Sequence, residues 1–248
     1  MPRFFVEPDH IQDNTVSIYG DDAHHISRSL RMASGEKVTV CDMCGVEYFC
    51  ELDGFFEDRV TAKILSKKPS DTEPPFAAHI YQALPKGEKL DYIIQKAVEC
   101  GASSITTFSS ERCIAKEKGD ENKQKRRQRI ALEAAKQSGR GIVPTVRSGL
   151  SFQQTLSEMK GYDAVLFCYE DERAVSMKGL LKNLKAENKL SERPNIALVI
   201  GSEGGFSEKE ARMAREAGAY TVGLGKRILR SETASGFALA CLVYEFEL

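Results

Sequence analysis

A proline-rich segment divides this sequence into two parts with different patterns of apolar residues. The segment, residues 67–75, holds three prolines among charged and small polar residues. Proline lacks the backbone N–H that a helix interior or a central strand needs, so neither element is expected to run through it. We therefore expect an extended linker here, with a small domain before it (residues 1–68) and a larger domain after it (residues 77–248).

Short runs of the β type dominate the part before the linker. They predict five strands, and one helix over residues 22–32 that ends before Ser34 and Gly35. The predicted strands are residues 3–6, 15–19, 37–41, 46–52 and 59–65. Strands this short and this close in sequence favour a small β-barrel.

After the linker, apolar strands alternate with amphipathic helices. The predicted strands are residues 78–84, 104–108, 164–169, 195–200 and 220–224, and the clearest helices are residues 89–100 and 208–217. This alternation predicts an α/β domain with a mainly parallel sheet and helices on its faces. Ligands of such sheets bind beyond the carboxyl ends of the strands, so the loops that follow the strands are the candidate sites.

Composition excludes several classes of protein. Hydrophobic residues make up 42% of the 248 residues and charged residues 29%, which argues against general disorder. The net charge of -1 excludes binding to nucleic acid through overall positive charge, but allows a local basic surface. No apolar run approaches the roughly 20 residues that cross a bilayer. Arg3, Glu7 and Asp9 stand where a signal peptide would be apolar, so we expect no membrane association and a cytoplasmic location.

The seven cysteines have no spacing typical of a disulfide framework, and we expect reduced thiols. Cys41 and Cys44 form a single C-x-x-C pair with no second pair or nearby histidine to complete four zinc ligands. The adjacent His24 and His25 cannot share one helix face. We therefore expect no metal site.

The loop at residues 201–207, with the sequence GSEGGFS, follows a predicted strand. Its glycines allow the backbone to approach a ligand closely, although a plain turn between strand and helix explains them equally well. Ser207 and Glu210 form a capping-box pattern that predicts the start of the next helix. The loop lacks both the Gly-Lys-Ser/Thr of a phosphate-binding loop and a G-x-G-x-x-G pattern.

A second candidate loop, residues 225–233, places Ile228 and Leu229 between arginines. Either Ser231 or Thr233 is expected to cap the last helix, residues 232–245. That helix is apolar almost all round, which predicts burial in the core or against another subunit.

Arg112 follows the strand at residues 104–108. A planar guanidinium at a strand end suits an anionic ligand or a developing negative charge, and a surface salt bridge is the alternative. Beyond it, residues 116–129 carry seven basic and three acidic side chains. This run forms either a solvated helix face or a surface that contacts phosphates.

Short segments spread in order over nearly the whole chain resemble the RsmE family of the SPOUT superfamily. The members of this family are bacterial methyltransferases that act on N3 of a uridine in small-subunit ribosomal RNA. The matching segments are RFF at residues 3–5, HHISRSLR at 24–31, ALPKG at 83–87, IQK at 94–96, SER at 110–112, EAA at 133–135, QSGR at 137–140, IGSEGGF at 200–206 and LGKRILRSET at 224–233. Two departures are visible: Ser202 stands where the family usually has proline, and Ser231 where it usually has threonine.

The resemblance implies a PUA-like barrel followed by a SPOUT domain with a trefoil knot, which is an exception to the rule that chains are unknotted. It also implies a homodimer that forms through the last helix and acts on 16S ribosomal RNA in the small subunit. The implied cofactor is S-adenosylmethionine. The residues expected to bind this cofactor are Tyr169, Gly201, Glu203, Gly204, Leu224, Gly225, Ile228 and Leu229.

Uracil N3 must lose its proton before it can attack a methyl group. We expect Arg112 or Arg230 to stabilise the uracil anion, and Glu203 or Glu232 to assist the proton. The residues expected to bind RNA are Arg3, His25, Arg28, Arg31, Lys123, Arg126, Arg127 and Arg140. The alternatives left open are a ribosome-assembly factor that binds RNA without catalysis, and an α/β enzyme that acts on a small molecule.

Overall fold

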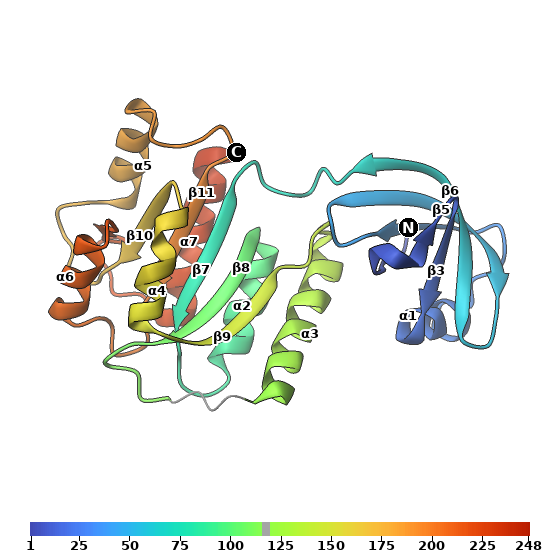
Figure 1. Cartoon of the computed structure of the whole chain (residues 1–248), viewed down its shortest axis with the longest axis horizontal. Coiled ribbons are helices and arrows are strands. Elements are labelled where there is room, and N and C mark those ends of the chain that lie inside the picture. The colour runs from blue at the N-terminus through green and yellow to red at the C-terminus, as the bar shows by residue number, and fades with distance from the viewer. Residues whose placement is uncertain (116–119) are drawn as a thin grey trace. The chain divides into compact units, whose positions relative to one another are not determined.

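The computed structural model describes residues 1–115 and 120–248, which form two compact units (Figure 1). Unit 1 comprises Met1–Glu73 and Ala135–Val143, and unit 2 comprises Pro74–Ala134 and Pro144–Leu248. The first boundary falls inside the proline-rich segment, but the return of residues 135–143 to unit 1 has no signal in the sequence. The first four residues of the predicted basic run lie outside the described residues.

Unit 1 contains a six-stranded sheet in the order β1-β4-β5-β6-β3-β2. Its strands are β1 (Arg3–Phe5), β2 (Ile11–Gln12), β3 (Thr15–Tyr19), β4 (Lys37–Cys41), β5 (Val46–Phe55) and β6 (Arg59–Pro69). Strands β1 and β4 are parallel, and the other neighbours are antiparallel. Alternate side chains of these strands, among them Val16, Val38 and Val60, form a buried core, as the barrel pattern predicts.

The expected linker begins later than predicted, because β6 continues through Pro69. Lys68 pairs with Glu47 and Pro69 with Val46 of β5. On its other side, β6 pairs with β3 only as far as Lys63, so the end of β6 has a free edge. Proline is tolerated there because no neighbouring strand needs its N–H.

The predicted helix over residues 22–32 is two shorter elements. Helix α1 (Gly20–His24) continues as a π-helical turn, η2 (His25–Ser29), in which Leu30 N donates to His25 O at 2.9 Å. The segment ends at Arg31, whose φ of +52° is left-handed. The wider π-helical turn changes the spacing of side chains that a regular helix would give.

Unit 2 is built on a parallel sheet in the order β12-β10-β11-β7-β8-β9, as the alternation of elements predicts. Its strands are β7 (Ala77–Ala83), β8 (Ala102–Ser109), β9 (Thr145–Ser151), β10 (Ala164–Cys168), β11 (Asn195–Ile200) and β12 (Tyr220–Val222). Its helices are α2 (Lys89–Glu99), α3 (Glu121–Ser138, of which residues 135–138 belong to unit 1), α4 (Phe152–Glu158), α5 (Met177–Ala186), α6 (Glu208–Glu216) and α7 (Ser231–Phe246). Figure 1 shows α4 in front of the sheet and α2 and α7 behind it.

The sequence pattern does not predict the edge strand β9. Its outer edge is covered by two amides of α3 spaced one helical turn apart: Gln124 donates to Val146 O, and Gln128 accepts from Val146 N at 2.9 Å. Gln128 also donates to Pro144 O at 3.0 Å. These contacts occupy backbone groups that would otherwise be open to pairing with another chain.

Helix α7 differs from its prediction in two ways. Its N-cap is Arg230, which makes no capping hydrogen bond through its side chain, so the expected cap by Ser231 or Thr233 is wrong. One face packs in the core through Ala238, Leu239 and Leu242, whereas Phe237 and Tyr244 are exposed. No helix in the described part of the chain is both long enough and apolar enough to span a membrane.

Candidate active site

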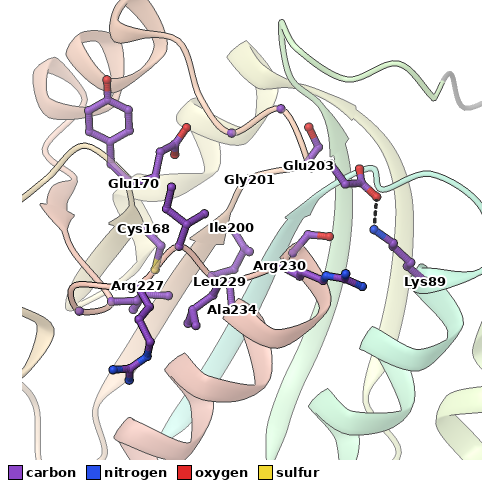
Figure 2. Close-up of a pocket in the computed structure, with 18 residues that line it drawn as sticks. Lys89, Cys168, Glu170, Ile200, Gly201, Glu203, Arg227, Leu229, Arg230 and Ala234 are labelled. Atoms are coloured by element: carbon purple, nitrogen blue, oxygen red, sulfur yellow. Dashed lines mark hydrogen bonds and ion pairs between the residues drawn. The ribbon is translucent and has the colours of Figure 1, made fainter.

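Three loops at the carboxyl ends of β10, β11 and β12 surround a cavity of about 470 Å³ (Figure 2). The strand-end rule for parallel sheets predicts a ligand site at this position. The lining residues are Lys89, Cys168, Tyr169, Glu170, Ile200, Gly201, Ser202, Glu203, Gly204, Gly205, Leu224, Gly225, Arg227, Ile228, Leu229, Arg230, Ser231 and Ala234.

The glycine loop after β11 packs against two neighbouring segments more closely than side chains would allow. A Cβ on Gly204 would lie 2.9 Å from the Cβ of Arg112. A Cβ on Gly205, whose φ is +62°, would lie 1.6 Å from Glu170 Oε1. The simple-turn interpretation is therefore incomplete, because these glycines let three loops meet around the cavity.

Both ends of this loop are fixed. Phe206 is fully buried and packs on Phe167, with ring centroids 4.1 Å apart. The predicted capping box is confirmed: Ser207 Oγ accepts from Glu210 N at 3.2 Å, and Glu210 Oε2 accepts from Ser207 N at 2.9 Å. The loop thus runs between a core aromatic side chain and a capped helix, which restricts its conformations.

Glu170, in the loop after β10, joins the glycine loop to Arg112. Its Oε1 accepts from Phe206 N at 3.2 Å and lies 3.9 Å from Arg112 Nη1. Arg112 Nη1 also donates to Gly204 O at 3.2 Å. Arg112 is half exposed, and in this structure it supports the glycine loop from outside the cavity lining.

Lys89, in the first turn of α2, brings the two predicted catalytic carboxylates together. Its Nζ lies 2.8 Å from Glu203 Oε1, a contact drawn in Figure 2, and 3.5 Å from Glu232 Oε2. Both oxygens of Glu203 also accept from Lys86 N. Ser231 Oγ donates to Glu232 Oε2 at 3.2 Å.

These contacts decide the charge states. Burial raises the pKa of Glu203, but the Lys89 and backbone hydrogen bonds outweigh it and hold that pKa below its usual value. Glu232 follows the same pattern: burial is outweighed by its own backbone N–H, Ser231 and Lys89, which lower its pKa. The hydrogen bond to Glu203 raises the pKa of Lys89. Both carboxylates are therefore ionised at neutral pH, beside a protonated amine.

Figure 2 shows Lys89 and Arg230 on one side of the cavity, with Cys168 and Glu170 on the other. Burial raises the pKa of the Cys168 thiol to about 12, so it is a neutral part of the wall. Arg230 lines the cavity at the start of α7.

All eight residues predicted to bind the cofactor line this cavity, and of the predicted catalytic residues Glu203 and Arg230 line it. Glu232 reaches the site through Lys89, and Arg112 through Gly204. The sequence reasoning missed Lys89 and Glu170. Their positions in the sequence could have indicated them, because Lys89 comes after strand β7 and Glu170 after strand β10.

The residues predicted to bind RNA have different surroundings. His25, Arg28, Arg31 and Lys123 are exposed. Lys123 Nζ lies 4.0 Å from Asp120 Oδ2, and three others also have partners within their own unit: Arg3 pairs with Glu47 at 3.1 Å, Arg126 contacts Asp91, and Arg127 donates to Ser148 at 2.7 Å.

The prediction that Arg140 binds RNA does not fit the structure. Its side chain is buried and its Nη2 lies 2.5 Å from Glu73 Oε2. Glu73 Oε1 also accepts from Gly141 N and Ile142 N, which fastens residues 135–143 to unit 1. A guanidinium in this position cannot reach a phosphate without leaving Glu73, so we no longer expect Arg140 to bind RNA.

Within residues 1–115 and 120–248, no three His, Cys, Asp or Glu side chains are grouped so that they could hold a metal ion. The cysteines in the same ranges are free. Cys41 is buried and Cys44 exposed, in keeping with strand and turn positions.

Comparison with known proteins decides the family. Residues 72–243 match the model of an RNA methyltransferase domain, and residues 18–65 that of an RNA methyltransferase PUA domain. Ribosomal RNA small subunit methyltransferase E of Bacillus subtilis is 37% identical over 100% of this chain and 98% of its own length. The chain belongs to the ribosomal RNA small subunit methyltransferase E family.

Solved structures of similar proteins have the same fold. The methyltransferase E of Neisseria gonorrhoeae bound to S-adenosyl methionine is 30% identical, with a TM-score of 0.85 over 99% of this chain and 98% of that one. A methyltransferase described as putative from Legionella pneumophila, in complex with the same cofactor, is 28% identical, with a TM-score of 0.81 over 98% and 97%.

Proposed function

We propose that this chain transfers the methyl group of S-adenosylmethionine to N3 of a uridine in 16S ribosomal RNA. The observation that carries the proposal is the cavity between the loops that follow β10, β11 and β12, which collects all eight residues expected to bind the cofactor. The methyltransferase E of Neisseria gonorrhoeae and the Legionella pneumophila protein described as a putative methyltransferase bind S-adenosylmethionine, which supports the same cofactor here.

The residues around the cavity fit this cofactor. Ile200, Leu224 and Leu229 supply apolar surface for an adenosine, and the glycine loop exposes main-chain groups for its polar edges. The buried Ser202 hydroxyl has no hydrogen-bond partner among the described residues, which suits a site that receives a polar ligand. When bound, the cofactor supplies an electrophilic methyl group on its sulfonium.

The side chains beside the cavity can prepare the uracil. N3 carries a proton, and the two ionised carboxylates Glu203 and Glu232 are the candidate groups to take it. Such assistance is typically worth about a hundred- to ten-thousand-fold in rate. We assign the stabilisation of the charge on O2 or O4 to Arg230, because it lines the cavity, whereas Arg112 contacts Gly204.

The substrate is expected to be RNA of the small subunit, with the target base out of its stack. We propose that exposed side chains, His25, Arg28 and Arg31 in unit 1 and Lys123 in unit 2, contact its backbone. The exposed Phe237 and Tyr244 of α7 support the predicted homodimer, in which these side chains would be covered. The knot implied by the resemblance and the cytoplasmic location expected from the sequence stay predictions.

Mass-spectrometric mapping of nucleosides in small-subunit RNA tests the proposal. RNA from cells without the protein should lack one N3-methyluridine, which the purified protein and S-adenosylmethionine should restore. An unchanged nucleoside profile, with RNA binding retained and no saturable cofactor binding by calorimetry, would support the RNA-binding assembly factor instead.

Variants test the roles of the two arginines. Arg230→Ala should lower turnover far more than cofactor affinity, because it acts on the uracil charge. Arg112→Ala should lower both, because it also supports the glycine loop. If both variants lost turnover and cofactor affinity in the same proportion, the assignment to Arg230 would be wrong.

A further inference from the structure

Lys89 stands where a lysine is unfavourable for local structure. It is the first residue of α2, and the preceding N-cap residue, Glu88, makes no capping hydrogen bond through its side chain. The N-terminus of a helix carries a partial positive charge, so a cation in the first turn is repelled by the exposed N–H groups. A residue that breaks a local rule in this way needs a reason in the tertiary structure.

The tertiary contacts of Lys89 supply that reason. Its Nζ lies within 3.5 Å of two carboxylates, Glu203 in the loop after β11 and Glu232 in the first turn of α7. Each of the three side chains is about one third exposed or less. One ammonium therefore joins the starts of two helices and the glycine loop.

In the part of the chain that the structure describes, the other charged groups around Glu203 and Glu232 form no ion pair with them. Among the ion pairs of the described residues, Lys89 is the one cation within 4.0 Å of either carboxylate. Glu203 also receives the N–H of Lys86, and Glu232 the hydroxyl of Ser231. Arg227, Arg230 and Glu170 line the same cavity without an ion pair to either glutamate.

We propose that Lys89 is a positioning residue of the methyl-transfer site: it holds Glu203 and Glu232 together as an ionised pair and sets the pH range in which that pair can take a proton. The inference rests on the proposed function for the reaction, but not for the electrostatics of the three side chains. Without the ammonium, two carboxylates would face each other beside the cavity, and each would resist ionisation.

The contacts predict the direction in which the pKa of each carboxyl changes in variants of this site. Lys89 contributes to holding the pKa of both carboxyls below their usual value. In Lys89→Met both groups should titrate at a higher pH than in the wild type. In Glu203→Gln, Glu232 should titrate at a lower pH, because it no longer shares the ammonium with a like charge.

An NMR titration of the full-length protein labelled with ¹³C at the glutamate carboxyl tests these shifts without any reaction. Glu203→Gln and Glu232→Gln assign the two signals. Lys89→Arg should leave the titrations close to wild type, because arginine keeps the charge. The matched control is Lys96→Met, on the same helix, where Lys96 pairs with Glu99 at 2.7 Å. The control should leave both signals unmoved.

Methylation at a series of pH values gives the second readout. The rate of Lys89→Met relative to wild type should be lowest in acid and should recover as the pH rises, since its carboxylates ionise later. A merely structural role would give a ratio that does not change with pH. Unmoved carboxyl signals in Lys89→Met, or a pH-independent ratio, would overturn the inference. A wild-type protein that methylates no uridine would overturn the proposed function instead, and the NMR titration would still decide whether Lys89 holds the pair.

Discussion

The close contact between Gly205 and Glu170 allows us to predict the loss of stability in Gly205→Ala. Gly205 has a φ of +62°, and a Cβ there would lie 1.6 Å from Glu170 Oε1 and 2.4 Å from its Cδ. In Gly205→Ala the Glu170 carboxylate must therefore move away. The movement breaks the hydrogen bond that Glu170 accepts from Phe206 N at 3.2 Å.

Two costs add up in this variant. Alanine in the left-handed region costs about 1 to 2 kcal/mol. A lost hydrogen bond to a charged acceptor at this partly exposed position costs about 1.5 kcal/mol. The free energy of unfolding should thus fall by about 3 kcal/mol. Because Phe206 anchors the glycine loop, affinity for S-adenosylmethionine should fall as well.

A double-mutant cycle separates the two costs. In a Glu170→Ala background, Gly205→Ala should cost only the backbone term, about 1 to 2 kcal/mol. Gly87→Ala is the matched control, because Gly87 has a φ of +64° and nothing lies within 4 Å of the position that a Cβ would take there. Urea denaturation measures each variant, and calorimetry measures the cofactor. Equal costs of Gly205→Ala in both backgrounds would refute the role of Glu170.

Three further predictions follow from other contacts. Ser207→Ala removes the cap of α6 and should lower the free energy of unfolding by about 1 kcal/mol in urea denaturation, and an unchanged midpoint would contradict it. The hydrogen bond from Arg147 lowers the pKa of Glu158, so the free energy of unfolding should fall as the pH falls through the carboxyl range. Glu158→Gln should lose less stability over that range than the wild type, and an equal loss would argue against a stabilising Arg147–Glu158 pair. Lys123→Ala should reduce the salt dependence of RNA binding by about one unit of slope, and an unchanged slope would exclude Lys123 from the RNA surface.

The order of elements follows from local patterns in the sequence. Short β-type runs predict the strands of unit 1 except the two-residue β2 (Ile11–Gln12), and alternation of apolar strands with amphipathic helices predicts the parallel sheet of unit 2. The cap at Ser207 is equally local, because its partner Glu210 is three residues away. The edge strand β9 escapes this reasoning: only Val146 of its side chains is buried, and its outer edge is covered by α3.

The glycines around the cavity could be found in the sequence, but their reason could not. A glycine-rich loop after a strand indicates either a turn or a ligand site, and the resemblance to a family favours the ligand site. Only the structure shows that Glu170 and Arg112 occupy the space where side chains at Gly205 and Gly204 would lie. Such a contact depends on the packing of separate loops, which local periodicity does not encode.

The charges show the same limit. As sequence, Arg140 is predicted to bind RNA and Lys89 is one lysine among many. In the structure Arg140 is buried against Glu73, 67 residues away, and Lys89 meets Glu203, 114 residues away. Sequence by itself determines which segments become strands and helices, since that choice depends on neighbours along the chain. The fold decides which charges meet and which face solvent, because those energies depend on distances between segments that only tertiary packing sets.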